Sequence, residues 1–295
     1  MIATMRHPCR VVTSLLLGSL ASAQIPLRYD LTTSLPFHYG ITIDATFAQT
    51  RGAQRAEFGM HFALHFTATP GEKKDGKTLI AHLLHRVQAR STMPMAKVDW
   101  DSDRKDSQPG ALQSLAELVG KTFVVPVDEF GAIGRVQAPT GVTPKATDDL
   151  GAGDLDTLFG QYFIALPNTA IAEGGSWDAT VKMFNPKLTG GGDVKVTSKL
   201  LRVAEGKAVV ERKFHVDPAT APKAPGMTVT VDKAESTWML DLSTGRVSGA
   251  VMELASTVAR EGQQIASSVR VTVDPEAAPG PKTGTATPVP ASAGK

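Results

Sequence analysis

The chain has 295 residues, a formal net charge of +2 and a single cysteine, Cys9. No long basic run is present, so the sequence offers no surface suited to nucleic acid or to an anionic membrane. Because Cys9 precedes the expected mature chain, that chain is expected to hold no disulfide, no thiolate metal site and no cysteine nucleophile.

The N-terminus, MIATMRHPCRVVTSLLLGSLASAQ, has the order of regions that is typical of a secretory signal peptide. Arg6 and Arg10 precede an apolar run at 11–20, and the small residues Ala21 and Ala23 predict cleavage before Gln24. The apolar run is too short to span a bilayer core of about 30 Å, so no transmembrane segment is expected after cleavage. These features predict an exported protein, periplasmic or extracellular.

A period of two dominates residues 25–273, which predicts half-buried strands. In RAEFGMHFALHFTAT, the residues on one face are Phe58, Met60, Phe62, Leu64 and Phe66. Turns are expected around Gly131, at Glu205-Gly206 and at Thr244-Gly245. Runs of hairpins favour antiparallel pairing, and about eleven strands are predicted.

Two segments have helical spacing instead. The first is SQPGALQSLAELVG, in which Leu112, Leu115 and Leu118 recur and Gly120 marks the end. The second is DLGAGDLDTLFGQYFIALPN, in which Asp154 is a candidate N-cap. Its apolar stripe consists of Leu155, Leu158, Phe159, Tyr162 and Phe163.

Together the patterns predict a mainly β fold within one domain, residues 24–273. A sheet of so many long strands must twist and curl, so we expect a large curved antiparallel sheet with both short helices on its concave face. That concavity is either filled with side chains or left as a pocket. Residues 274–295, rich in proline, alanine, glycine and threonine, are predicted to be a disordered tail.

The stretch VDWDSDRKDSQPG was tested as a calcium loop. Asp99, Asp101 and Asp103 match its first ligand positions, but Arg104 stands where a glycine must turn the chain. Gly110 stands where the bidentate glutamate should be. The stretch is therefore interpreted as a strand end followed by a polar loop, with no metal site.

Three histidines form a second candidate site. If Phe62 pairs with Leu83 across the GEKKDG turn, then His61, His65 and His82 share the polar face of the hairpin. Three imidazoles could hold zinc or copper. The alternative is that they are ordinary polar residues on a strand, and a one-residue slip would move His82 away.

Other signatures of catalysis are missing. G-K-T occurs in LVGKTF, but Leu115 stands where a phosphate loop needs glycine. G-x-S-x-G, H-E-x-x-H and G-x-G-x-x-G after a strand do not occur. No catalytic residue, resident metal or cofactor is predicted.

The order of motifs resembles a family of exported bacterial proteins and lipoproteins known only as a domain of unknown function, many of them from planctomycete-type bacteria. The resemblance covers about residues 25–273 and rests on these stretches: LRYDL, VDWDSD, LQSLAELVGKTFVVPVDEFGAIGRV, LPN with EGGSW, and STWMLDLSTGRVSGAVMEL. The chain departs from that family at Leu35-Pro36, where a glycine is usual. The resemblance implies no activity and no site residues, and Trp177 and Trp238 are expected to fill the core.

Three functions stay open on this sequence. The first is a non-enzymatic envelope protein that binds an apolar ligand or lipid on the curved sheet. The second is a structural module that binds another envelope protein, with the tail as tether. The third is a metal-dependent or hydrolytic enzyme that uses His61, His65 and His82.

Overall fold

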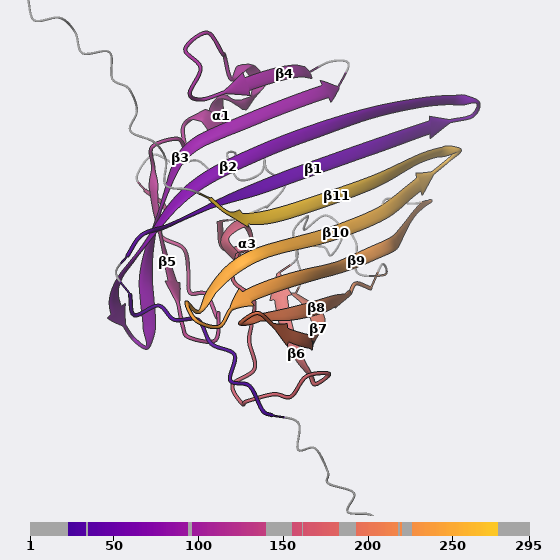
Figure 1. Ribbon diagram of the computed structural model, residues 1–295. Coiled ribbons are helices and arrows are strands. Elements are labelled where there is room, and N and C mark those ends of the chain that lie inside the picture. The colour runs from indigo at the N-terminus through magenta and orange to yellow at the C-terminus, as the bar shows by residue number, and fades with distance from the viewer. Residues whose placement is uncertain are drawn as a thin grey trace, which may run out of the picture.

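The computed structural model describes residues 23–33, 35–93, 96–139, 155–160, 162–182, 193–217, 219 and 226–276. Within these residues, eleven strands form one antiparallel sheet in the order β4-β3-β2-β1-β11-β10-β9-β8-β7-β6, with β5 paired to β3 (Figure 1). The strands are β1 Phe37–Arg51, β2 Gln54–Lys74, β3 Lys77–Met93, β4 Ala96–Asp101, β5 Thr122–Val127, β6 Ser176–Lys182, β7 Asp193–Ala204, β8 Lys207–His215, β9 Met227–Asp241, β10 Arg246–Arg260 and β11 Gln263–Pro275. The predicted mainly β fold with about eleven antiparallel strands is confirmed.

Both expected helices are present but shorter than their apolar spacing predicts. A 3-10 turn η1, Gly110–Leu112, leads into α1, Gln113–Ala116, and the second helix is α3, Leu155–Gly160. Leu118 lies beyond the end of α1 and is buried, and Gly120 has the positive φ of +77° that helix ends favour. The N-cap expected at Asp154 lies outside the described residues.

Three hairpins turn on two-residue loops in which both residues have positive φ. These loops are Asp75-Gly76, Glu205-Gly206 and Glu261-Gly262. This is the geometry of a type I′ turn, which matches the right-handed twist of the flanking strands. The loop between β9 and β10 includes Thr244-Gly245, so both tight turns predicted from the sequence are confirmed.

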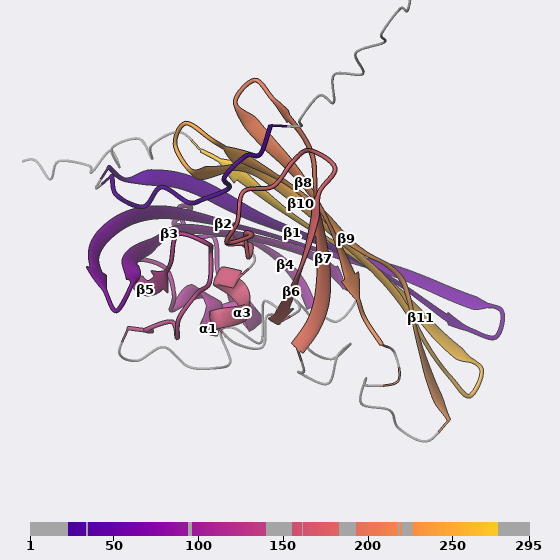
Figure 2. The same ribbon diagram turned by 90° about the horizontal axis from the view of Figure 1, so that it is seen from below.

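The sheet curls at one end, where β2 and β3 bend around α1 and α3 (Figure 2). The register between β2 and β3 shifts by one residue between Pro70 and Lys73, and again beside His65, which leaves His85 as a bulge. Bulges bend a strand and increase its twist locally. At the opposite end, the β1–β2 and β10–β11 hairpins run well past both helices (Figure 2).

The space between the helices and the curled end of the sheet is filled. Tyr39 and Phe66 of the sheet stack at 5.1 Å between ring centroids, and Phe66 meets Phe159 of α3 at 5.8 Å. Tyr162 covers Tyr39 at 4.1 Å. All four rings are buried, so this part of the concave face is packed with side chains.

Three further expectations concern the two chain ends, the tryptophans and membrane-spanning helices. Strand β11 continues to Pro275 and so includes the first residues of the expected tail, whereas 277–295 lie outside the described residues, as do residues 1–22 of the expected signal peptide. Trp238 is buried and half-buried Trp177 donates its Nε1–H to the Ala165 carbonyl at 2.9 Å, in keeping with their expected packing roles. No helix in the described part of the chain is long and apolar enough to cross a membrane.

Candidate functional site

The histidine site predicted from the sequence does not form, because the β2–β3 register is different. Phe62 pairs with Ala89, not with Leu83, and Ala68 pairs with His82. The one-residue shift after Pro70 turns His82 to the inner face of the sheet, while His61 and His65 stay on the outer face. Within the described ranges, no three histidine, cysteine, aspartate or glutamate side chains are placed to hold a metal ion.

His82 belongs to the packed interior. Its Nδ1 and the Tyr39 hydroxyl share a hydrogen bond of 2.7 Å, and burial lowers the pKa of His82 to about 3. His61 and His65 each have a carboxylate partner at 2.7 Å, from Asp44 and Glu276 respectively. Each carboxylate therefore orients one histidine, and the two histidines are held separately.

The aspartate loop is structural, as the sequence predicted. Asp101, at the end of β4, accepts two hydrogen bonds from Arg86, at 3.1 and 2.6 Å, and one from Gln88 at 3.0 Å. These bonds hold the pKa of Asp101 well below its usual range. Asp99 pairs with Arg104 at 3.1 Å, so this loop closes on itself.

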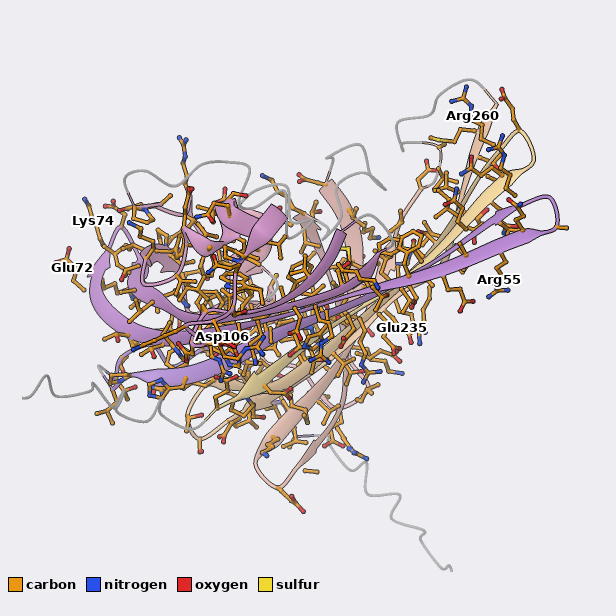
Figure 3. All side chains as sticks on the ribbon, turned by 90° about the horizontal axis from the view of Figure 1, so that it is seen from above. Arg55, Glu72, Lys74, Asp106, Glu235 and Arg260 are labelled. Carbon is orange, nitrogen blue, oxygen red and sulfur yellow. The ribbon has the colours of Figure 1, made fainter. Side chains whose placement is uncertain are left out.

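The outer face of the sheet carries a polar row that we call the outer belt. Its members are directly paired from strand to strand: Asp99, Arg90, His61, Asp44, Arg270, Glu253, Glu235, Lys213, Thr197 and Asp178. Glu253 and Glu235 carry like charges, and Lys233 forms a salt bridge with each of them. Glu235 is labelled near the middle of the sheet in Figure 3. The belt is therefore a polar surface in contact with solvent over much of its length.

The inner face has a matching row, which changes character along its length. It begins with the apolar residues Trp100, Ala89, Phe62, Ile43, Val271 and Met252. It then reads Ser236, Arg212, Ser198 and Trp177 on β9, β8, β7 and β6. A charged residue thus occupies an inward position of an otherwise apolar surface.

Ser198, Arg212 and Ser236 form what we call the arginine patch. Arg212 is only 5% exposed and Ser198 is 0% exposed. Within the described residues, neither the Nε of Arg212 nor the Oγ of Ser198 has a hydrogen-bond partner. Burial lowers the pKa of Arg212 to about 10, because the cation has lost water without gaining a carboxylate.

Past the helices, the inner face continues as a set of half-buried apolar side chains, which we call the open strip. It consists of Phe47, Phe58, Met60, Val229, Val231, Val258 and Ile265. Phe47 and Phe58 stack at 5.3 Å between centroids, and Ser256 and Ser267 satisfy each other across the middle at 2.8 Å. Five neighbouring strands contribute, so the strip is about 19 Å wide at about 4.8 Å per strand.

The open strip lies toward the sheet end marked by Arg55 and Arg260, and the curled end is marked by Glu72 and Lys74 (Figure 3). Arg212 is on β8, which neighbours β9, and it lies four residue pairs along the ladder from the level of Val231. Strand geometry therefore places Arg212 roughly 14 Å from Val231. Half-buried Phe214 and Ala234 lie on the inner face between them. The candidate site therefore consists of the apolar open strip and, toward the helices, the cation Arg212.

A large cleft lies elsewhere and is a weaker candidate. It encloses about 970 Å³ between the N-terminal segment and the turns after β2 and β9. Three of its charged groups are already partnered, since Arg28 pairs with Glu129 and the Asp30 carboxylate accepts hydrogen bonds from Thr32, and its remaining lysine, Lys73, is exposed. No described group there awaits a ligand in the way that Arg212 does.

Sequence reasoning missed the arginine patch, although a signal was present. In KAVVERKFH the alternation puts Ala208, Val210, Arg212 and Phe214 on one face. A charge in an apolar series is informative, because arginine is almost never fully buried without a partner. Ser198 and Ser236 carry no comparable signal, since single serines occur on either face of a strand.

The fold defines a class: an open antiparallel sheet that curls around short helices and bears an apolar inner face. No family model and no curated protein matches the sequence. Among solved structures, the fold is similar to lipovitellin, described for its lipid–protein interactions, with a TM-score of 0.54 and 10% identity. The match covers 86% of this chain and 27% of that one, so the chain spans about a quarter of lipovitellin. At this identity the likeness shows the fold alone.

Two bacterial structures match at TM-scores below 0.5, which is too low to carry an argument. One is an outer membrane lipoprotein-sorting protein domain from Vibrio parahaemolyticus, with a TM-score of 0.15, 7% identity, and 81% of this chain and 86% of that one covered. The other is a DUF1329 family protein from Desulfovibrio piger, with a TM-score of 0.17, 10% identity, and 84% and 89% covered. The planctomycete-type family that the sequence resembles therefore stays a prediction.

Proposed function

We propose that this protein is an exported envelope protein that binds an apolar ligand, such as a lipid, along the open strip. The observation that carries the proposal is the strip itself. Its phenylalanine and β-branched side chains continue the face that forms the core, yet they are only half-buried in the described structure. Contiguous apolar surface of this kind on an exported protein marks a binding site for an apolar molecule or a partner.

Two further observations support a ligand. The part of the inner face under the helices is filled, so the strip is where apolar area is left over. The fold is shared with lipovitellin, a protein described for its interactions with lipid. The signal peptide predicted from the sequence would bring the protein to the envelope or beyond it.

The test uses the full chain, exported by a bacterial host, purified and stripped of lipid. An uncharged apolar dye such as Nile red should bind with strong fluorescence enhancement. Phe58→Glu should reduce that binding at least about ten-fold, because it puts a charge into the middle of the apolar bed. The matched control is Thr46→Glu, on an adjacent strand but on the solvated outer face, and it should leave dye binding unchanged.

Equal dye binding by both variants and the unaltered protein would rule out the strip as the site. Native mass spectrometry before lipid removal is the complementary measurement. A co-purified apolar molecule would support the proposal and give its class. A strip that binds no dye, in a protein that forms stable complexes with another envelope protein, would favour the structural role instead.

A further inference from the structure

The arginine patch raises a question of energy. Removing a cation from water is strongly unfavourable unless an anion or a set of hydrogen bonds replaces the water. Arg212 has neither in the described structure, where no salt bridge includes it and its Nε is unpartnered. A bound anion would offset the unfavourable burial of the guanidinium.

The neighbours of Arg212 compensate it only in part. Its guanidinium lies over the Phe214 ring at 5.1 Å, which is a favourable cation–π contact. The phenol of Tyr29 also acts on it electrostatically, but burial raises the pKa of that phenol, so it stays neutral. Neither group supplies the negative charge that a buried guanidinium binds most strongly.

The three residues of the patch are arranged to bind an anion. Ser198 and Ser236 lie directly opposite Arg212 on the two flanking strands, about 5 Å away on the same face. Ser236 accepts the Trp238 Nε1–H at 3.1 Å, which leaves its own hydroxyl proton for another acceptor. The Ser198 hydroxyl has no partner among the described residues. Two hydroxyl donors therefore flank a guanidinium, which can bind both oxygens of one acid group.

We infer that the ligand is an anionic amphiphile, whose carboxylate or phosphate binds at Arg212, Ser198 and Ser236 while its apolar chain lies along the open strip. The inference rests on the proposed function for the placement of the chain. The distance allows the end of one acyl chain to reach the strip, because Val231 at its near end lies roughly 14 Å from Arg212, about half of a 30 Å bilayer core. Phe214 and Ala234 line the path between the two.

The test compares ligands that differ only in the head group, at about pH 8 with the full chain stripped of lipid. Palmitate is compared with hexadecanol, and palmitoyl lysophosphatidate with monopalmitoylglycerol. In the unaltered protein, at least one anionic ligand should bind about ten-fold or more tightly than its neutral partner. Preference for palmitate identifies a carboxylate site, and preference for lysophosphatidate identifies a phosphate site.

Arg212→Met should bring each anionic-to-neutral affinity ratio close to one and leave the affinity for hexadecanol unchanged. The control, Arg270→Met on the outer belt, removes an exposed cation that pairs with Glu253 and should keep the ratio. The unliganded Arg212→Met protein should melt at the same or a higher temperature, because an unpaired buried charge is gone. If Arg212 served the structure alone, that variant would melt lower and its ratio would be that of the unaltered protein.

The unaltered protein decides the matter even if the variant fails to fold. Equal binding of anionic and neutral ligands would overturn the inference and leave the proposed function intact. Failure of all four ligands and of Nile red to bind would remove the proposed function and the inference together.

Discussion

The inner face of this sheet has two regions that are built from the same strands and behave differently. Under α1 and α3, alternating residues such as Phe66 are sealed into an aromatic core. Eight residues earlier in β2, Phe58 points to the same face and is only half-buried. The local pattern does not change between them, so the difference comes entirely from what lies over the strand.

With this difference, one sheet can combine stability with the binding that we propose. The covered region supplies a core large enough to fold a chain without disulfides. Once that core holds the register, the same strands can extend past the helices and present an apolar surface without being needed for folding. The two regions should therefore respond very differently to the same substitution.

Truncating a phenylalanine in each region should give the largest contrast. Phe66→Ala leaves a cavity between Tyr39 and Phe159 and should lower the free energy of unfolding by about 3–5 kcal/mol. Phe58→Ala should cost about 1 kcal/mol, because its site is already partly solvated. Urea unfolding followed by tryptophan fluorescence measures both.

Similar losses of unfolding free energy from the two substitutions would contradict the comparison, since they would mean that the open strip is as much a part of the core as the covered region. A reduced affinity for apolar dye in Phe58→Ala, with normal dye binding in a folded Phe66→Ala protein, would strengthen the distinction between the two regions.

Acid should act first on the covered region, through His82. The folded protein holds the pKa of this imidazole near 3, whereas in the unfolded chain it is about 6.5. Between these values the unfolded state binds more protons, so stability is lost as the pH falls through that window, at no more than about 1.4 kcal/mol per pH unit. Above about pH 6.5 this histidine contributes no pH dependence.

The double variant Tyr39→Phe with His82→Leu removes the imidazole and its hydrogen-bond partner together, so no buried polar atom of the pair is left alone. Its unfolding free energy should fall less between pH 7 and pH 4 than that of the unaltered protein. His61→Leu, at an exposed site, is the control and should keep the full loss. Identical pH dependence in the double variant would show that His82 is accessible to protons and that the covered region is not sealed.

Substitutions on the outer face should change the unfolding free energy least. These changes should be equally small over the covered region and over the open strip. Glu253→Gln in the outer belt removes ion pairs to Lys233 and Arg270, all of them on exposed side chains. It should cost no more than about 1 kcal/mol and less at high salt. Glu57→Gln, near the tip of the β1–β2 hairpin, removes one exposed pair to Arg55 and should have no measurable effect in the same urea experiments. A large loss from either would place stability on the outer face, against the division drawn for the inner one.

Much of this molecule follows from local sequence. Alternation in stretches such as residues 56–68 specifies strands, and Glu205-Gly206 specifies a tight turn, because both depend on the preferences of neighbouring residues. The interpretation of Asp99 to Asp103 as a strand end followed by a polar loop is local in the same way, since it depends on the residues at each position of one short stretch.

The register between β2 and β3 could not be predicted from local sequence. The predicted histidine site depended on that register and was therefore wrong. A period of two looks the same after any shift by two residues, so many registers satisfy the apolar pattern. The actual register depends on a turn at Asp75-Gly76, on the bulge after Pro70 and on the fit of Tyr39 against His82. The last of these joins residues 43 positions apart, which no local window contains.

The candidate site lies between these cases. The sequence determined that Phe58 and Arg212 each point to the same face as their apolar neighbours, because strand geometry alternates side chains. Only the tertiary structure decided that this face is covered at Phe66 and open at Phe58, and that Arg212 lies buried between two serines from other strands. Burial and partnership are set by segments that are distant along the chain, so the distinction between a core and a binding surface arises only when the sheet curls around its helices.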